Sequence, residues 1–232
     1  MLYEKMDELK AQAGLGAMLF HMNASGKFSF YIPLETVPAV GSTPESIDID
    51  VTSSDVITKI KGKMTMEDKE TEFFLHRDSI RKLKKSVGKV EKFLVVNPDF
   101  TGYRFDAEVS YAQNDASSND PLKGTMKLTP KMDGGFIDNV YDLIQRTAKF
   151  KSAIEPVVEL DETTGTYKTI IETDPADATI TVKSETEAVA TAAIDKGALT
   201  VTGVKSGSAV IVVTATKDGY ASWESTILVI VP

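Results

Sequence analysis

Apolar and polar residues alternate along much of the first 130 residues of the chain. The clearest case is Lys59–Met66, where lysines alternate with apolar positions. Successive side chains of a strand point to opposite faces, so this segment predicts a strand with one apolar and one basic face. The same alternation, with a short apolar run at 93–96, predicts further strands at 28–32, 47–51, 71–75, 103–111 and 122–128.

Two of these strands are expected to form a long hairpin. The polar segment Glu67–Glu70 separates the strand that ends at Met66 from the strand at 71–75. A short polar segment between two alternating segments is typical of a hairpin turn. We therefore expect a hairpin from about Ile57 to His76, with its tip at the polar segment.

Helical spacing marks three segments. Asp78–Gly88 carries signals at both ends, because Asp78 can cap the first amides and Gly88 suits the left-handed position after the last turn. Its buried stripe is expected to consist of Ile80, Leu83 and Val87. Apolar residues at the same spacing also predict a helix over 2–13 and another from Phe136 to Lys149, after the Gly134–Gly135 breaker.

The second half of the chain shows only strand patterns. They recur at 166–172, 178–183, 188–194, 198–203, 209–216 and 224–231. Turn dipeptides such as Lys196–Gly197 and Asp218–Gly219 separate them, which is typical of a β-sandwich. Residues 150–166 are interpreted as a linker or a first strand. The sequence thus predicts two mainly β domains, 1–155 and 156–232, the first a β-sandwich or barrel with a flanking α-helix.

Charge is distributed unevenly between these halves. The chain of 232 residues has a net charge of −8. Residues 156–232 contain 5 Lys/Arg against 11 Asp/Glu, a balance of −6, whereas residues 1–155 have a balance of −2. The uniformly basic surface of a typical nucleic-acid-binding domain is therefore absent. No apolar run is long enough to predict a membrane span, and the first residues do not resemble a signal peptide.

The residues that usually carry chemistry are missing or isolated. The absence of cysteine excludes disulfides, thiolate metal sites and cysteine nucleophiles. Neither His21 nor His76 has a partner at metal-ligand spacing, and the acidic run from Asp48 lacks the glycine and glutamate of a calcium loop. No phosphate-binding or dinucleotide-binding loop is present. We expect no enzyme activity, no cofactor and no bound metal.

Two surface features leave alternatives open. The basic strand face of Lys59, Lys61 and Lys63 could meet phosphate, pair with an acidic neighbour in an assembly, or keep an exposed strand soluble. Because no aromatic residues are interleaved with it, assembly or solubility is favoured over nucleic acid. Tyr220 and Trp223 are expected mainly to pack on the second domain, with contact to an outside surface as the alternative.

The order of features in residues 1–155 resembles the major tail tube proteins of long-tailed bacteriophages. The resemblance rests on the long hairpin, the helix beside it, the run Gly102-Tyr-Arg-Phe-Asp-Ala-Glu-Val109, and the later run Leu122-Lys-Gly-Thr-Met-Lys-Leu128. It implies a β-sandwich or barrel with one flanking helix, a fold shared with type VI secretion tube proteins.

Residues 157–232 resemble bacterial immunoglobulin-like domains of group 2. The resemblance rests on the runs Ala178-Thr-Ile-Thr-Val182, Gly197-Ala-Leu-Thr-Val-Thr-Gly203, Lys205-Ser-Gly-Ser-Ala-Val-Ile-Val-Val213 and Ile227-Leu-Val-Ile-Val231. A tryptophan frequent in that family near residues 181–183 is missing here. Such domains are commonly appended to phage structural proteins and to bacterial adhesins, and the first residues show none of the export signal expected of an adhesin.

Together the two resemblances imply a virion protein made in the host cytoplasm. Its first domain would form rings, expected to be hexameric, that stack into a hollow tail through which DNA is ejected. The expected contacts between rings involve the N-terminal segment and the hairpin, namely Ile60, Met64, Met66, Glu67, Asp68 and Lys69. Expected partners are other copies of the chain, the tape measure, terminator and baseplate proteins of the tail, and passing DNA that is not bound specifically. The second domain would project outward, with weak contact to the host surface at most and no membrane insertion.

Two other readings remain open at this point. The chain could serve elsewhere in a phage particle, as a capsid decoration or a tail terminator, and would then not polymerise. It could also be a cell-surface or glycan-binding immunoglobulin-like module, and would then be a monomer that binds glycans.

Overall fold

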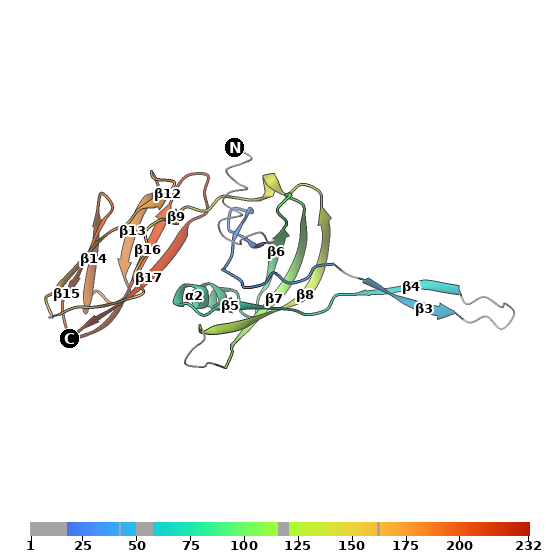
Figure 1. Ribbon diagram of the computed structural model, residues 1–232, viewed down its shortest axis with the longest axis horizontal. Helices are drawn as coiled ribbons and strands as arrows, with labels where there is room; N and C mark the ends of the chain where they lie inside the picture. Colours follow the sequence, from blue (N-terminus) through green and yellow to red (C-terminus); the bar gives the residue numbers. More distant parts are fainter. Residues whose placement is uncertain (1–17, 42, 50–57, 116–120, 162) are drawn as a thin grey trace. The chain divides into compact units, whose positions relative to one another are not determined.

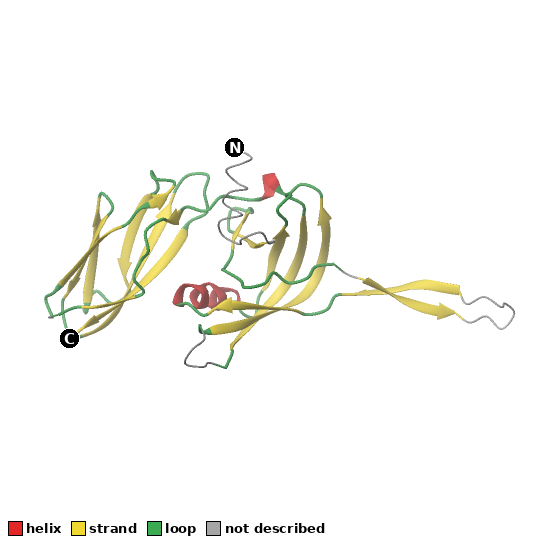
Figure 2. Ribbon diagram, viewed as in Figure 1, coloured by secondary structure: helices red, strands yellow, loops and turns green. Residues whose placement is uncertain are grey.

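The computed structural model describes residues 18–41, 43–49, 58–115, 121–161 and 163–232. The chain divides into two compact units, Met1–Ile144 and Gln145–Pro232. Strands make up most of the described chain, and α2 with one short 3-10 turn provides its helical segments (Figure 2). The predicted mainly β fold class is confirmed. The helix expected at 2–13 lies outside the described residues.

The first unit contains an antiparallel six-stranded sheet in the order β2-β1-β6-β7-β8-β5 (Figure 1). The predicted strands at 93–96, 103–111 and 122–128 correspond to β6, β7 and β8, which are longer than expected. The strands are β1 (Met18–Met22), β2 (Phe28–Phe30), β5 (Lys69–Phe74), β6 (Val90–Val96), β7 (Gly102–Gln113) and β8 (Lys123–Ile137).

One face of this sheet carries the main core of the unit. Alternate residues of β7 are buried there, with Phe105 stacked on Phe93 of β6 at 5.7 Å between ring centroids. Helix α2 (Arg77–Ser86) packs against this core through Leu83, which is fully buried. The apolar residues that alternate along β7 therefore lie on the face of the sheet that the helix covers.

The opposite face of the sheet divides into two halves. Over β1 and β6, side chains such as Phe20 and Leu94 form a second core, which Phe100, Val140 and the 3-10 turn Tyr141–Leu143 complete. Over β7, β8 and β5 the same face carries polar and charged side chains that are partly exposed. We call this second half the open face.

The predicted hairpin from Ile57 to His76 is wrong. β4 (Thr58–Thr65) pairs instead with β3 (Thr43–Ile49), and these two strands form a separate two-stranded sheet that we call the arm. The return strand β5 pairs with β8, where Phe73 is opposite Gly124. A Cβ at that glycine would lie 2.7 Å from the Phe73 ring. A glycine on β8 thus makes room for a core phenylalanine, and this pairing outweighs the local turn signal.

The predicted ends of helix α2 also need correction. His76 is the residue before the first turn and makes no side-chain capping bond, whereas Asp78 lies inside the first turn. The buried residues are Ser79, Leu83 and Ser86, rather than the predicted stripe through Val87. Gly88 does have the expected positive φ, at 72°.

The helix expected from Phe136 to Lys149 is absent from the structure. β8 continues through the glycine pair to Ile137, because a register shift opposite Arg104 and Phe105 leaves Gly134 as an extra residue in its pairing with β7. Asp133 supports this extension, since its carboxylate accepts hydrogen bonds from the Tyr103 hydroxyl at 2.5 Å and the Gly135 amide at 2.8 Å. Gly135, with φ of 76°, supplies a left-handed residue and does not end the strand.

The second unit is a sandwich of two sheets around one core (Figure 1). The four-stranded sheet has the order β10-β17-β16-β13, and the three-stranded sheet has the order β11-β15-β14. The six strands that the sequence predicted are all present, as β11 (Thr166–Ile170), β13 (Thr179–Ser184), β14 (Ala190–Asp195), β15 (Ala198–Gly203), β16 (Gly207–Thr216) and β17 (Trp223–Val231).

Three short strands complete the second unit, and one of them lies in the segment 150–166 that was interpreted as a linker or a first strand. β10 (Val157–Glu159) runs parallel to β17, and β9 (Lys149–Phe150) pairs with β12 (Thr173–Asp174). Phe150 and Ile154 pack on the core of the second unit. Residues 145–155 therefore belong to the second unit, and the boundary between the units lies 11 residues before the one predicted.

Candidate assembly surfaces

The open face presents stripes of opposite charge on neighbouring strands. Lys127 of β8 is paired in register with Glu70 of β5 on one side and with Ser110 of β7 on the other. Glu70 and Glu72 of β5 are two positions apart, and Lys123 and Lys127 of β8 are four apart, so each pair lies on one face of its strand. Lys131 follows at a register shift between β8 and β7.

Each of the three β8 lysines on this face is paired with a carboxylate. The amino group of Lys123 lies 2.5 Å from the Glu35 carboxylate and 3.4 Å from that of Glu72. Lys127 lies 2.7 Å from Asp68 and 3.7 Å from Glu70. The third pair joins Lys131 to Glu108 of β7 at 3.1 Å. Carboxylates on both sides of β8 thus compensate the positive charge of its lysines.

These pairs shift the pKa values of their members in opposite directions. A hydrogen bond from Lys127 lowers the pKa of the Asp68 carboxyl, and the bond to Asp68 raises the pKa of Lys127. The same reciprocal effect lowers the pKa of Glu35 and raises that of Lys123. At neutral pH all four groups are charged, so the open face is a fixed array of paired charges with an excess of carboxylates.

The predicted ring-contact residues do not form one hairpin tip. Ile60 and Met64 lie in β4 of the arm, and Met66, Glu67 and Asp68 form the connection from β4 to β5. Lys69 begins β5 and is buried against the core. Its amino group donates to the Ala39 carbonyl at 2.7 Å, and desolvation lowers its pKa. Of the six residues, the structure thus brings Asp68 to the open face and Lys69 to the interior.

The sequence did not single out Lys123, Lys127 and Lys131 as a set. A signal for them exists, because lysines at every fourth residue of a strand share one face. The pairing of β8 with β5, which supplies the carboxylates, could not be read from that spacing. The structure is needed to show that these lysines are compensated.

Tyr220 and Trp223 are both partly buried in the second unit. The Tyr220 ring lies beneath two cations, with the Arg146 guanidinium 5.3 Å and the Lys217 amino group 5.8 Å from its centroid. Lys217 also pairs with Asp177. Trp223 begins β17 and is opposite Ala215 in the sheet. Tyr220 is therefore engaged by neighbouring side chains of its own unit.

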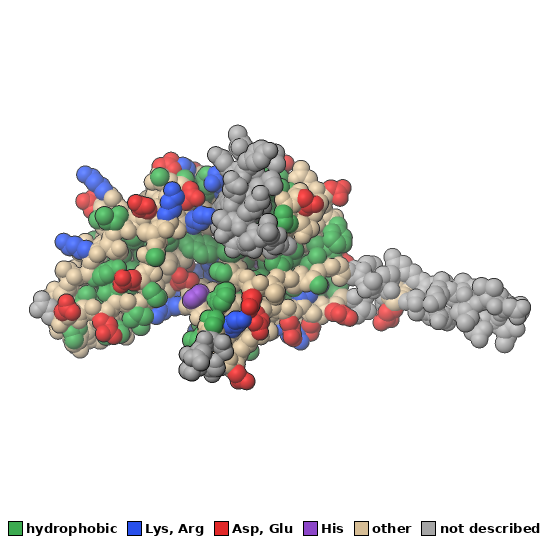
Figure 3. All heavy atoms as spheres, in the orientation of Figure 1, with side chains coloured by type: hydrophobic (Ala, Val, Ile, Leu, Met, Phe, Trp, Pro, Cys, Tyr) green, Lys and Arg blue, Asp and Glu red, His purple; other side chains and the backbone are tan. Residues whose placement is uncertain are grey.

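Apolar side chains are exposed at several points of the first unit. Phe136 is 69% exposed, although its ring packs edge-on against Tyr103 at 4.8 Å. Met132 on the open side of β8 is 50% exposed. On the face seen in Figure 3, basic and acidic side chains are interspersed over the described surface. Isolated exposed apolar residues of this kind are common on protein surfaces.

Among the residues described, no group of three or more histidine and carboxylate side chains is arranged to hold a metal ion. None of the described helices has the length and apolar character required to cross a membrane.

Comparisons with known proteins place the chain in no family. No protein-family model matches the sequence, and no curated protein matches it either. Among solved structures, the chain is similar to the tandem Ig repeats of Dlar, with 10% sequence identity and a TM-score of 0.29. That match covers 63% of this chain and 90% of the other.

Proposed function

We propose that this chain is the tube-forming subunit of a long-tailed bacteriophage, with a second, immunoglobulin-like domain that decorates the outside. The observation that carries the proposal is the six-stranded antiparallel sheet with one open, charge-paired face, to which the chain adds a separate two-stranded arm. The sequence resemblance of both halves points to the same role. The protein acts by assembly and catalyses no reaction.

In the proposed tube, sheets of neighbouring subunits stand side by side around a central channel. The open face of each sheet lines this channel, and the covered half contributes the stability of the subunit. A head-to-tail contact repeated from ring to ring generates an open filament. The arm reaches the next ring, because its two strands form their own sheet outside the six-stranded sheet (Figure 1).

A channel for DNA must not hold the phosphates it admits. Nonspecific DNA affinity grows with the number of phosphates that lysines and arginines neutralise. On the open face, carboxylates already pair with Lys123, Lys127 and Lys131. A surface with an excess of carboxylates repels the DNA backbone, so the polymer slides through without specific binding.

Electron microscopy of the purified chain at moderate salt tests the proposal. Stacked rings or tubes of uniform diameter are expected, at a width of about 100 Å for a ring of six small domains. A chain truncated after Ile144 should form tubes of the same inner diameter without the outer domain. Discrete small particles at every concentration, also in the presence of the proteins that initiate tail assembly, would instead favour a decoration or terminator role.

A further inference from the structure

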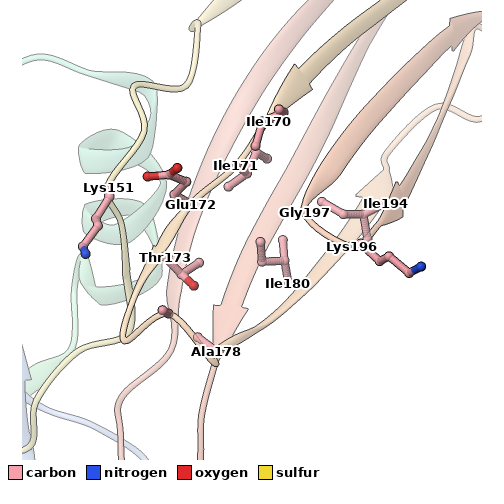
Figure 4. A pocket seen from close by; sticks show the side chains of 11 residues that line it. Lys151, Ile170, Ile171, Glu172, Thr173, Ala178, Ile180, Ile194, Lys196 and Gly197 are labelled. Carbon is pink, nitrogen blue, oxygen red and sulfur yellow. The ribbon is translucent and has the colours of Figure 1, made fainter.

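A hollow of about 680 Å³ lies at one end of the second unit, but it singles out no ligand. Figure 4 shows Glu172 and Lys151 on one side of it and Lys196 on the other, so its charges are mixed. The Thr173 hydroxyl at its border already donates to the Pro175 carbonyl at 2.9 Å. The base of the arm in the first unit shows a more specific arrangement.

Two legs join the arm to the six-stranded sheet. The first leg, residues 33–41, leads towards β3, and the second leg, residues 66–68, leads from β4 into β5. β3 and β4 pair with each other and, among the described residues, form no ladder with the larger sheet. The placement of the arm on the subunit therefore depends on the contacts that hold its two legs.

The first leg lies beside β5 and is fastened to it mainly by side chains. Among the described residues, a single backbone hydrogen bond joins the two segments, from the Glu35 amide to the Glu72 carbonyl at 2.9 Å. The Thr71 hydroxyl of β5 also donates to the Thr36 carbonyl of the leg. Polar side chains of β5 thus take over much of the role that backbone pairing plays between the strands of the sheet.

Lys69 fastens the end of this leg that lies nearer the arm. Its side chain is buried, and its amino group donates to the Ala39 carbonyl at 2.7 Å and lies 6.0 Å from the centre of the Phe105 ring. Desolvation lowers the pKa of this amino group, while the charges of Asp133 and Glu67 act to raise it. An apolar side chain of similar length would fill the same space without the cost of burying a charge. The bond to the leg is what the lysine adds.

Asp68, the neighbour of Lys69 in the sequence, holds the second leg from the other face of the sheet. Its carboxylate lies 2.7 Å from the Lys127 amino group on the open face. Successive side chains of an extended chain point to opposite faces. Lys69 therefore fastens the first leg on the core side, and Asp68 fastens the second leg on the open side.

We propose that Asp68 and Lys69 form a two-sided clamp that fixes the arm on the subunit. The clamp rests on the proposed function, because it makes these two residues positioning residues for the arm that reaches the next ring. Neither of them has to contact that ring. A buried lysine can in this way affect the stacking of rings, although its own side chain is not accessible to a partner.

The distance between two spin labels in the full chain tests the clamp. Because the chain has no cysteine, Asp48→Cys on β3 and Lys84→Cys on α2 give two unique attachment points. Pulsed electron paramagnetic resonance measures the distribution of distances between the labels, and an excess of unlabelled chain suppresses signals between labelled copies. We expect a narrow distribution when the clamp is intact.

Removal of either half of the clamp should widen this distribution about twofold or more, because a freed leg behaves as a flexible linker. Lys69→Met keeps nearly the same length but donates no hydrogen bond, and Asp68→Ala removes the partner of Lys127. Lys69→Arg keeps both the cation and the donor, so it should restore most of the narrow distribution.

Two controls separate the clamp from a general loosening of the first unit. Leu83→Ala opens a cavity in the same core without removing a bond to either leg, so it should lower stability and leave the distribution unchanged. Glu108→Gln removes the partner of Lys131, an ion pair that joins β7 to β8 and includes neither leg. It should also leave the distribution unchanged.

Electron microscopy of the same variants connects the clamp to stacking. Long tubes from the wild type, with short or absent tubes from Lys69→Met, support the proposal. A wild-type distribution that is already broad would overturn it, and so would clamp variants whose distributions are as narrow as that of the wild type. If the wild type forms no tubes but the variants still widen its narrow distribution, the proposed function is rejected and the clamp stands.

Discussion

The Lys127 amino group lies 2.7 Å from the Asp68 carboxylate, so the middle of the open face is bonded to the connection that precedes β5. Glu70 approaches the same amino group at 3.7 Å. These contacts join residues about 60 positions apart in the chain, and they depend on the pairing of β5 with β8. The charge of the open face is thus a consequence of the sheet topology.

Removing the carboxylates should convert the open face into a DNA-binding surface. We expect the triple variant Asp68→Asn, Glu70→Gln, Glu72→Gln to bind duplex DNA about tenfold more tightly than the wild type at 50 mM salt, because Lys127 loses both of its carboxylate partners, whereas Lys123 keeps Glu35. One freed lysine should steepen the slope of log K against log salt by about 1. Fluorescence anisotropy of a labelled duplex across a salt series measures both quantities.

The control for this experiment must change the net charge equally. Glu159→Gln, Asp161→Asn and Glu187→Gln remove three exposed carboxylates from the second unit and leave the lysine pairs of the open face unchanged. An equal gain of affinity in this control would mean that overall charge, and not the lysines of the open face, governs DNA binding. A triple variant of the open face that binds no better than the wild type would refute the idea that these carboxylates keep DNA from binding.

Tyr31 gives the first unit a predictable sensitivity to alkali. Burial raises the pKa of its hydroxyl to about 12, with a smaller contribution from the nearby Glu91 charge. The folded-state pKa lies above the unfolded value near 10, so the associated stability is complete below about pH 10 and is lost as the pH rises towards 12. A shift of this size corresponds to about 1 to 3 kcal/mol.

Tyr31→Phe isolates this effect from the other ionisations of the chain. We expect the wild type to lose stability between pH 9.5 and about pH 12 more steeply than the variant, as measured by urea unfolding. An ultraviolet titration should also show one late-ionising tyrosine in the wild type that the variant lacks. Equal pH profiles for the two proteins would show that Tyr31 ionises in the native state like an exposed phenol.

The sequence predicted elements well wherever burial produces a strict period. In the second unit every predicted strand is present, because Ile227, Val229 and Val231 alternate with outward residues and glycine-containing turns separate the strands. β7 was equally clear, with buried Tyr103 and Phe105 at alternate positions. Local pattern is sufficient for such strands, since one side chain in two meets the core.

Pairing partners could not be predicted in the same way. The segment Glu67–Glu70 has the composition of a turn, yet β5 crosses to β8, where Gly124 accommodates Phe73. The helix expected after Gly134–Gly135 failed for a related reason, since Gly135 serves as a left-handed residue inside a long strand. Both errors come from contacts distant in sequence. The compensated lysines of the open face depend on the same long-range pairing.

The two units should respond separately to cavities in their cores. Leu83 is fully buried in the first unit, and Leu199 is fully buried in the second. Leucine-to-alanine changes at such sites cost about 2 to 5 kcal/mol. We expect Leu83→Ala to lower the stability of the first unit alone, and Leu199→Ala that of the second.

Hydrogen exchange followed by mass spectrometry distinguishes the units within the full chain. Peptides from β7 and β8 should lose protection in Leu83→Ala, and peptides from β16 and β17 should lose it in Leu199→Ala. A loss of protection across both units from either single change would mean that they unfold as one cooperative body.

The arm should be dispensable for folding but required for stacking, if the proposed function holds. β3 and β4 pair with each other and form no ladder with the six-stranded sheet among the described residues. Replacing residues 46–61 with Asn-Gly keeps the pairs at Thr43 and Pro44 and closes them with a favoured two-residue turn. We expect unchanged protection of β6, β7 and β8 by hydrogen exchange, together with loss of long tubes in electron microscopy.

A second shortened loop supplies the control for this deletion. Replacing residues 115–121 between β7 and β8 with the same Asn-Gly turn also shortens a hairpin of the first unit, but it leaves the arm intact. This control should still form tubes. Because a stacked tube needs a contact that reaches the next ring, tubes of normal length from the armless chain would assign ring stacking to another surface. Loss of protection in β7 of the armless chain would instead make the arm part of the folding unit.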